Sequence, residues 1–281
     1  MVTQPGVIRL AVFGSPVAHS HSPFIHQAFA RQLGLSVDYQ AIEARQHEFA
    51  ARLDQLAAAG GRGCNVTLPL KHAAWEMARR SSPAAERARA ANTLVFEQPG
   101  DWFADNTDGR GLVRDLARHL GQSLFGQRIL ILGAGGAAAG ILGDLLEQQP
   151  AAICIGNRTP ERAERLARSH AARGQISTCA LDRLDTLGPF ELVINATSAG
   201  HGGRHPLLPE QILTATGWCY DLNYGAAAKP LRQYCAAAGL RYQDGLGMLV
   251  EQAALSFTLW TGTEPDGEPV LQALRGRETA L

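Results

Sequence analysis

The sequence predicts an α/β fold with two domains, each built on a sheet of largely parallel strands. Short apolar segments alternate with helical segments along the chain of 281 residues, an order typical of parallel sheets with helices between their strands. A strand, a glycine turn and a helix open a second such series at residue 128. Because 281 residues are long for one compact domain, we expect two α/β domains in succession.

The expected elements follow from the spacing of apolar residues and from the polar, glycine and proline residues between them. Strands are expected over residues 8–13, 37–43, 64–67, 93–97, 102–105, 129–132, 153–155, 176–180, 192–195, 218–222 and 241–243. Helices are expected over residues 23–33, 47–59, 84–90, 109–120, 137–149, 160–172, 230–238 and 248–261, and from about residue 71. The run Pro99-Gly100-Asp101 indicates a hairpin. The domain crossing is expected near residues 121–126, and the last helix is expected to pack back on the first domain.

The composition argues against several classes of function. Lys plus Arg equal Asp plus Glu, so the chain has no formal net charge, and neither a nucleic acid nor a membrane is expected as a partner. The N-terminus lacks the pattern of a signal peptide, and no apolar run approaches the ~20 residues that span a bilayer. We therefore expect a cytoplasmic protein, a monomer or a homodimer, that acts on a small-molecule substrate.

The cysteines and histidines predict neither a disulfide framework nor a metal site. The five cysteines are scattered without CxxC spacing, so reduced thiols are expected. His19, His21 and His26 lie close together in the sequence, but no cysteine or carboxylate is near them, so polar contacts at the helix end are the simpler interpretation. The cysteines are Cys64, Cys154, Cys179, Cys219 and Cys235.

A glycine-rich turn after residues 129–132 predicts a dinucleotide site. Gly133 allows the turn, Gly135 lets the backbone approach a pyrophosphate, and Ala138 permits close packing of helix and strand. The phosphates would contact free N–H groups at the start of the helix. Such turns also occur for packing alone, but the strand before this one and the alanine-rich helix after it favour a Rossmann-type cofactor domain.

The end of the next strand predicts NADP rather than NAD. An NAD site usually has an acidic residue there, about 20 residues after the glycines, whereas this chain reads Asn157-Arg158-Thr159-Pro160-Glu161-Arg162. Thr159 is expected as N-cap and Pro160 as the first residue of the helix. Arg158 and Arg162 would then flank the positive end of that helix and bind a 2′-phosphate. The alternative is two solvated surface arginines.

Ser20 and Ser22 present two hydroxyls between a strand and a helix. Together with the N–H groups at the start of that helix, they could hold a carboxylate. The alternative is that Ser22 only caps the helix that Pro23 opens.

Lys71 is a candidate acid–base residue, because it follows a polar strand and begins a helix. In the extended strand, Asn65 and Thr67 project from the same face. At a helix start the dipole disfavours the ammonium form of a lysine, and a lowered pKa would suit it to proton transfer. Asp108 is the candidate partner, although capping of its own helix is the alternative role.

Taken in order, these segments resemble the shikimate dehydrogenase family over nearly the whole chain. The motifs that carry the resemblance are Ser20-His21-Ser22-Pro23, Asn65-Val66-Thr67-Leu68-Pro69-Leu70-Lys71, Asn92-Thr93, Asn106-Thr107-Asp108-Gly109, Gly133-Ala134-Gly135-Gly136-Ala137, Asn157-Arg158-Thr159, Tyr220-Asp221-Leu222-Asn223-Tyr224 and Asp244-Gly245-Leu246-Gly247-Met248-Leu249-Val250-Glu251-Gln252. His21 stands where lysine is frequent in this family, and Ala138-Ala139 replace a polar pair of some members.

The resemblance implies NADPH-dependent reduction of 3-dehydroshikimate to shikimate, with Lys71 as the catalytic acid–base residue and Asp108 as its partner. The substrate-binding residues expected are Ser20, Ser22, Asn65, Thr67, Asn92, Thr107, Tyr224 and Gln252. The cofactor-binding residues expected for NADP(H) are Gly133, Ala134, Gly135, Gly136, Ala137, Asn157, Arg158, Thr159, Arg162, Leu222 and Gly245.

The resemblance also implies an order of domains. Residues 1–120 would bind and convert the substrate, residues 121–246 would form the NADP-binding Rossmann domain, and residues 247–281 would form C-terminal helices that return to the first domain. Two alternatives remain, a quinate/shikimate dehydrogenase of broader substrate range and a non-catalytic NADPH-binding regulator. The arginines disfavour an NAD-using quinate enzyme, and the complete polar set around Lys71 disfavours a regulator.

Overall fold

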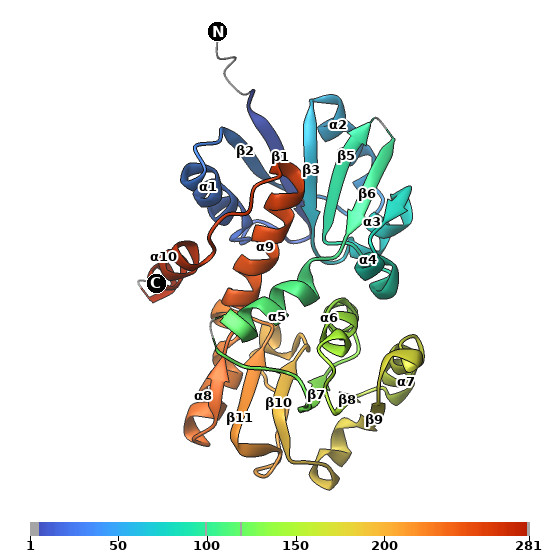
Figure 1. The fold of residues 1–281 in the computed structure, drawn as a ribbon, viewed down its shortest axis with the longest axis vertical. Coiled ribbons are helices and arrows are strands. Elements are labelled where there is room, and N and C mark those ends of the chain that lie inside the picture. The colour runs from blue at the N-terminus through green and yellow to red at the C-terminus, as the bar shows by residue number, and fades with distance from the viewer. Residues whose placement is uncertain (1–5, 99, 119, 280–281) are drawn as a thin grey trace. The chain divides into compact units, whose positions relative to one another are not determined.

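The computed structural model describes residues 6–98, 100–118 and 120–279, which form two compact units (Figure 1). Unit 1 consists of the described residues in Met1–Gly111 and Val250–Ala280, and unit 2 of those in Leu112–Leu249. The chain passes from unit 1 to unit 2 within helix α5 (Asp108–Arg118) and returns within helix α9 (Leu246–Thr261). Both units are α/β, so the predicted fold class is confirmed. Residue 119 of the helix predicted over 109–120 lies outside the described residues.

Within its described residues, unit 1 contains a mixed six-stranded sheet. Its strands, in spatial order, are β2 (Val37–Glu43), β1 (Ile8–Gly14), β3 (Gly61–Val66), β5 (Thr93–Gln98), β6 (Asp101–Asp105) and β4 (Arg80–Ser81). Strand β1 is parallel to β2 and β3, whereas β5 is antiparallel to both β3 and β6. The sheet is mixed because a connection as short as that between β5 and β6 can join only antiparallel strands. The predicted hairpin is therefore confirmed, although Pro99 itself lies outside the described residues.

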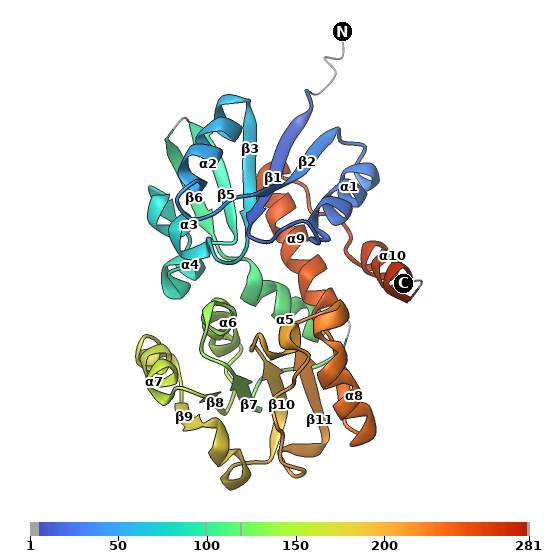
Figure 2. The same cartoon turned by 180° about the vertical axis from the view of Figure 1, so that it is seen from behind.

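Helices cover both faces of this sheet. Successive residues of β1 point to opposite faces: Phe13 packs against Phe49 of α2 (Phe49–Ala58), and Leu10 packs in one cluster with Trp260 of α9. Figure 1 shows α9 in front of the sheet, and Figure 2 shows α2 on the other face. The Trp260 indole donates to the carbonyl of Leu94 at 2.9 Å, which ties α9 to this sheet. The expected return of the C-terminal helices to the first domain is confirmed.

The other helices of unit 1 flank the strands. They are α1 (Ser22–Gln32), α3 (Lys71–Met77), α4 (Pro83–Ala88) and α10 (Glu268–Thr279). Helix α10 falls among the C-terminal helices expected over residues 247–281, but no bounds are predicted for it, although the Asp266 carboxylate accepts the N–H of Glu268, as a helix-start residue does. The N–H of Asp266 donates to the side chain of Gln32 at 2.8 Å, which joins this end of α10 to α1.

The described residues of unit 2 form a six-stranded sheet in which every pair is parallel. Its strands, in spatial order, are β12 (Arg241–Gln243), β11 (Leu213–Asp221), β10 (Phe190–Asn195), β7 (Arg128–Leu132), β8 (Ala152–Asn157) and β9 (Ile176–Ala180). The chain starts at β7, moves outward through β8 and β9, and then crosses to β10 on the other side. This doubly wound order confirms the Rossmann-type prediction. In such sheets ligands bind beyond the carboxyl ends of the strands, where the order reverses.

Helices cover both faces of the unit 2 sheet. They are α6 (Gly136–Glu147), α7 (Pro160–Arg168) and α8 (Lys229–Ala237). Ile131 of β7 packs with Leu142 of α6 on one face, and Leu130 packs with Leu231 of α8 on the other. The helix predicted over 160–172 ends at Arg168, where the Ser169 hydroxyl donates to the carbonyl of Leu166 at 2.7 Å and a short 3-10 helix follows.

Several sequence predictions concern features other than helices and strands. No helix in residues 6–98, 100–118 and 120–279 has the length and apolar character needed to cross a membrane. Across those same stretches, no group of three or more His, Cys, Asp or Glu side chains could hold a metal ion. All five cysteines are free thiols, and all except Cys179 are buried.

Candidate active site

Lys71 and Asp108, the predicted pair, meet in unit 1. Lys71 begins α3 shortly after the end of β3, and Asp108 begins α5 shortly after the end of β6. Because β3 and β6 both run antiparallel to β5, their carboxyl ends lie at the same edge of the sheet. The Lys71 Nζ donates to the Asp108 Oδ2 at 2.6 Å, and the two side chains are 18% and 9% exposed. Such a short, shielded contact between charged groups is a strong hydrogen bond, and it can hold and transfer a proton.

Asn92, at the amino end of β5, fixes the other carboxylate oxygen of Asp108. Its side-chain Nδ2 lies 2.8 Å from Asp108 Oδ1, 2.8 Å from Thr107 Oγ1 and 3.1 Å from Gln252 Oε1. Its Oδ1 accepts the backbone N–H of Thr107 at 2.9 Å. Asn92 is buried, so the two oxygens of Asp108 are held from opposite sides, by an amide and by an ammonium group.

The capping role considered for Asp108 belongs to Asn106. The Asn106 Oδ1 accepts the N–H of Asp108 at 3.1 Å, and the N–H of Asn106 donates to Asp105 Oδ1 at 2.8 Å. Asp105 is buried and also pairs with Arg110 and Ser82. The start of α5 is therefore held by residues that precede Asp108, and its carboxylate remains turned towards Lys71. The sequence prediction missed this role of Asn106, although Asn is a common helix-start residue.

Ser20 and Ser22 lie beyond the carboxyl end of β1, which is parallel to β3 and so ends at the same sheet edge. The capping interpretation of Ser22 is wrong, because Ser22 is the first residue of α1 and His21 takes the N-cap position without a side-chain cap. Ser20 Oγ accepts the N–H of Ser22 at 3.2 Å. Nearby, Tyr39 is buried, and burial raises the pKa of its phenol well above its usual range.

Of the two polar residues predicted for the strand over residues 64–67, Asn65 lies in the observed strand and Thr67 lies just outside it. Asn65 lies in β3, in register with Val12 and Thr93 of its two neighbours, and it is buried. Strand β3 ends at Val66, so Thr67 lies beyond it, with its N–H donated to the carbonyl of Phe13 at 2.8 Å. The side chain of Asn65 is bonded on both its oxygen and its nitrogen by protein groups.

Gln252 and Thr107 join the same polar cluster from α9 and from the turn before α5. Thr107 Oγ1 donates to the backbone carbonyl of Gln252 at 3.0 Å. A Cβ added to Gly111 would lie 2.7 Å from the Cβ and the backbone nitrogen of Gln252, so these two helices can approach only because residue 111 is glycine. Unit 1 therefore brings together seven of the eight substrate-binding candidates and the predicted pair at one edge of its sheet. Tyr224, the eighth candidate, is half-buried in unit 2.

The glycine turn of unit 2 has the predicted strand–turn–helix form. Gly133 has a φ of +105°, and an added Cβ would lie 3.0 Å from the carbonyl oxygen of Ala196, so only glycine fits. Ala138 is fully buried against the sheet. Gly135 is the N-cap of α6 and Gly136 its first residue, and a Cβ added at either position meets nothing within 4 Å. Packing explains Gly133 and Ala138, whereas the open space at Gly135 and Gly136 suits the approach of a phosphate to the helix start.

The two predicted arginines flank the start of α7. Strand β8 ends at Asn157, Thr159 takes the N-cap position without a side-chain cap, and Pro160 begins the helix. The side-chain amide of Asn157 donates to the carbonyl of Thr159 at 2.8 Å, which braces this turn. Arg158 and Arg162 are exposed. Two exposed guanidinium groups beside a helix start, with no acidic residue at the end of β8, fit an additional phosphate group.

Leu222 and Gly245, the residues expected near the nicotinamide, are adjacent in unit 2. A Cβ added to Gly245 would lie 2.4 Å from the carbonyl oxygen of Leu222, so the two backbones pass too closely for any side chain. The N–H of Gly245 donates to the carbonyl of Asn223 at 3.0 Å. This contact lies just beyond β11, at the sheet edge where a dinucleotide is expected.

Asp221, at the end of β11, organises the same edge and was missed as a site residue. It is fully buried, and its Oδ1 accepts the side-chain amides of Asn195 and Asn223 at 2.9 and 2.8 Å and the N–H of Asn223 at 3.0 Å. Asn223 in turn donates to the carbonyl of Thr197 at 3.0 Å. Burial raises the pKa of Asp221 to about 6, and these hydrogen bonds oppose that rise. A polar residue that ends a buried parallel strand is the sequence signal that points to this role.

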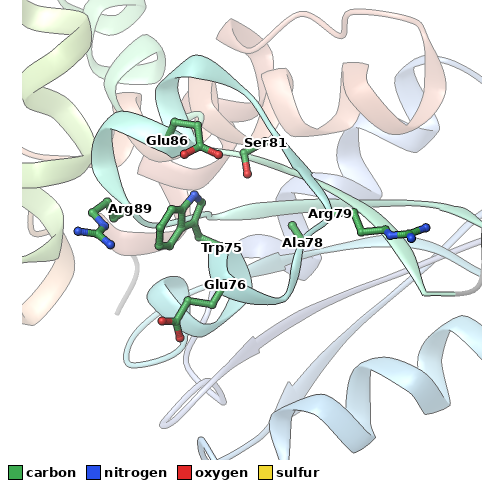
Figure 3. A pocket seen from close by; sticks show the side chains of 7 residues that line it. All are labelled: Trp75, Glu76, Ala78, Arg79, Ser81, Glu86 and Arg89. Atoms are coloured by element: carbon green, nitrogen blue, oxygen red, sulfur yellow. The ribbon is translucent and has the colours of Figure 1, made fainter.

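A surface hollow of about 420 Å³ lies apart from these residues, between α3 and α4 (Figure 3). Trp75 lines it, and the guanidinium carbon of Arg89 lies 5.2 Å from the centre of the Trp75 ring. No residue predicted for substrate or cofactor lines this hollow. It is therefore not the candidate active site.

The fold and the site define a class of enzyme, the NADP-dependent dehydrogenases with a separate substrate-binding unit. Comparison with known families narrows the class. A model of the shikimate dehydrogenase substrate-binding domain matches residues 12–94, a shikimate/quinate 5-dehydrogenase model matches residues 115–211, and a shikimate 5′-dehydrogenase C-terminal domain model matches residues 245–275. The chain belongs to the shikimate dehydrogenase family.

Individual relatives cover nearly the whole chain. The shikimate dehydrogenase (NADP(+)) of Xanthomonas campestris pv. campestris (strain B100) is 48% identical over 279 residues, which is 98% of each protein. The enzyme of the same name from Chromohalobacter salexigens is 49% identical and covers 95% of this chain and 97% of its own length. A crystal structure of shikimate 5-dehydrogenase from Thermus thermophilus in complex with NADP(H) and shikimate is 35% identical, with a TM-score of 0.82, and covers 96% of this chain and 99% of its own.

Proposed function

We propose that this protein is an NADP-dependent shikimate dehydrogenase, which reversibly reduces 3-dehydroshikimate to shikimate in chorismate and aromatic amino-acid biosynthesis. The observation that carries the proposal is the 2.6 Å contact between Lys71 Nζ and Asp108 Oδ2, set in a buried polar cluster. A pair of this kind gives and takes the proton of an alcohol that is made or consumed by hydride transfer.

In this proposal, Lys71 gives a proton to the oxygen of the reduced carbonyl and takes it back in the reverse direction. Asp108 accepts a hydrogen bond from the Lys71 Nζ, keeps that nitrogen in place and balances its charge. Asn92 holds the second oxygen of Asp108, so the carboxylate does not rotate away during proton transfer. The pair is less than one fifth exposed, which limits competition from water.

The remaining polar groups bind the substrate. The carboxylate would bind the hydroxyls of Ser20 and Ser22, which lie at the same sheet edge as Lys71. The ring hydroxyls would bind Asn92, Asp108 and Gln252. The other residues proposed for this site are Asn65, Thr67, Thr107 and Tyr224.

The residues that would hold NADP(H) lie at one edge of the unit 2 sheet. Gly133, Ala134, Gly135, Gly136 and Ala137 would surround the pyrophosphate, because the start of α6 is open there. When bound, NADPH supplies the hydride. The 2′-phosphate would lie among Asn157, Arg158, Thr159 and Arg162, and the nicotinamide end would lie near Leu222 and Gly245.

These roles divide the chain into parts. We assign substrate binding and catalysis to residues 1–120, NADP binding to residues 121–246, and support of the first domain to residues 247–281. We further propose that the protein acts in the cytoplasm, as a monomer or a homodimer. Chromatography with light scattering would distinguish the last two states.

A matrix of cofactors and substrates tests the function. Shikimate and quinate are each incubated with NADP and with NAD, and the absorbance of the reduced nicotinamide is followed. The proposal expects the highest kcat/KM for shikimate with NADP. Comparable rates with quinate would favour a quinate/shikimate dehydrogenase, and NADP binding without turnover of either acid would favour a non-catalytic regulator.

A further inference from the structure

His26, which the proposed function does not use, lies in the interior of unit 1. It projects from α1 and is fully buried. Its ring stacks on Tyr39, with centroids 4.3 Å apart and an interplanar angle of 11°, and it also contacts Phe257 and Trp260. Its Nε2 lies 3.0 Å from Asn65 Oδ1. The histidine is therefore enclosed by aromatic rings and has one polar neighbour, Asn65.

The hydrogen bonds of Asn65 determine which nitrogen of His26 carries the proton. The backbone carbonyl of Asn92 lies 3.1 Å from the Asn65 side chain and can only accept, so the amide nitrogen of Asn65 must face it. The amide oxygen then faces His26 and the hydroxyl of Tyr39, which donates to it at 2.7 Å. His26 Nε2 must therefore be the protonated nitrogen and must donate to Asn65.

A histidine at this position leaves its other ring nitrogen without a hydrogen bond to any described residue, which is unfavourable in the interior. Its Nδ1 is buried and has no hydrogen-bond partner among the described residues. Burial lowers the pKa of His26 to about 3, so the ring stays neutral. An apolar ring would fill the same space without leaving an acceptor unsatisfied. The bond from Nε2 to Asn65 is therefore the contribution of His26 that an apolar ring could not make.

From Asn65, hydrogen bonds lead to Asp108 with every donor pointing the same way. The Asn65 amide donates to Thr93 Oγ1 at 3.2 Å, and Thr93 Oγ1 donates to Asn92 Oδ1 at 2.9 Å. The Asn92 amide then donates to Asp108 Oδ1 at 2.8 Å. All four residues are buried. In a buried chain of this kind each bond polarises the next, and the donors together stabilise the carboxylate at its end.

We propose that His26 is a positioning residue for the Lys71–Asp108 pair, acting through Asn65. Its Nε2–H and the hydroxyl of Tyr39 fix the orientation of the Asn65 amide, and that orientation sets the donors that hold Asp108. Both lone-pair directions of the Asn65 oxygen are used, and its amide nitrogen has three acceptors within 3.2 Å. Asn65, which is also proposed for the substrate site, thus acts on the Lys71–Asp108 pair through this chain of hydrogen bonds. The inference rests on the proposed catalytic role of Lys71 and Asp108.

Two substitutions of His26 test its hydrogen-bond donor and its aromatic ring separately. His26→Phe keeps an aromatic ring between Tyr39 and Phe257 but removes the donor. His26→Gln loses the ring but offers an amide N–H at the position of Nε2. We expect His26→Phe to lower kcat for shikimate about tenfold, the effect of one lost neutral hydrogen bond. We expect His26→Gln to keep a larger share of the wild-type kcat. Tm should follow the opposite order, because the phenylalanine variant keeps the stacking.

The measurements are kcat and KM for shikimate, the Kd for NADP, and Tm for each variant. A kcat that is higher in His26→Gln than in His26→Phe, with unchanged Kd for NADP, supports the inference. Equal losses, or a larger loss in His26→Gln, overturn it, because packing alone predicts them. If the wild-type protein does not oxidise shikimate, the proposed function is wrong and this inference falls with it. If the wild type is active and the variants give one of the overturning results, the inference alone is wrong.

Tyr39→Phe provides an independent test if a His26 variant does not fold. It keeps the ring that stacks on His26 and removes the hydroxyl that is the second donor to Asn65 Oδ1. The inference expects a severalfold lower kcat for shikimate with the Kd for NADP unchanged. An unchanged kcat in this variant would overturn the inference.

Discussion

Lys71 Nζ and Asp108 Oδ2 lie 2.6 Å apart although 37 positions separate the two residues in sequence. Each residue begins a helix just beyond a strand, and the two strands end at the same edge of the unit 1 sheet. The contact therefore arises from the topology of the sheet, and Asn92 holds the carboxylate on its other side. Its chemistry can be tested one group at a time.

Replacing Lys71 by Ala should lower kcat for shikimate by about 10²–10⁴-fold, the usual range for a positioned acid–base group. NADP binding should stay unchanged, because the residues proposed to hold the cofactor lie in unit 2. Lys229→Ala is the matched control, since Lys229 is also the first residue of a helix and is exposed. Stopped-flow kinetics and NADP titration measure the two effects. A Lys71→Ala enzyme with wild-type kcat would contradict the assignment.

Replacing Arg158 or Arg162 by Ala should raise KM for NADP by about 10- to 100-fold, as expected when a charged hydrogen bond to phosphate is lost. KM for NAD should hardly change, because NAD lacks the 2′-phosphate. Arg168→Ala is the control, since Arg168 lies on the same helix, is exposed and pairs with Glu164. Parallel increases in KM for both cofactors would argue against a 2′-phosphate site here.

Much of the fold could be predicted, because the ends of its elements carry local signals. The strands expected over residues 37–43, 176–180 and 241–243 have the same bounds in the structure. Strand β4 has only two residues and no pattern that marks it. Helix α10 lies among the expected C-terminal helices, but its bounds were not predicted even though Asp266 supplies a usual start signal.

The residues of the site could be predicted from sequence, whereas the contacts between their side chains depend on tertiary structure. The position of Lys71 at a helix start followed from sequence, but its distance from Asp108 did not. His26 was interpreted as a polar residue at the helix end, yet it is fully buried. Its spacing from Phe29 and Ala30, at i+3 and i+4, places it on the apolar face of α1, and this signal could have found it.

Replacing Gly247 by Ala should destabilise unit 2 by about 1–3 kcal/mol, the usual effect of overpacking. An added Cβ would lie 1.9 Å from Asp115 Oδ1, and Asp115 is buried and accepts the hydroxyl of Tyr220 at 2.5 Å. Gly276→Ala in α10 is the control, because a Cβ there meets nothing within 4 Å, and a small gain from helix propensity is expected. Thermal unfolding followed by circular dichroism compares the two. A Gly247→Ala protein as stable as wild type would show that Asp115 can move aside.

Replacing Asp221 by Asn should remove a pH dependence of stability between about pH 4 and pH 6. Burial raises the pKa of Asp221 from 3.8 to about 6, so in this interval the folded protein binds a proton that the unfolded chain has released. The stability from this group is therefore fully present below the unfolded pKa and is lost as the pH rises through about 6. This difference in pKa between the folded and the unfolded chain corresponds to roughly 3 kcal/mol.

The Asn variant keeps an oxygen that can accept the amides of Asn195 and Asn223, but it cannot ionise. Its free energy of unfolding should therefore change less than that of wild type when the pH rises from 4 to 7, by up to about 3 kcal/mol. Urea unfolding at each pH gives both curves, and their difference isolates Asp221 from other titrating groups. Parallel curves would mean that Asp221 has the same proton affinity in the folded and unfolded chain, contrary to its burial at the end of β11.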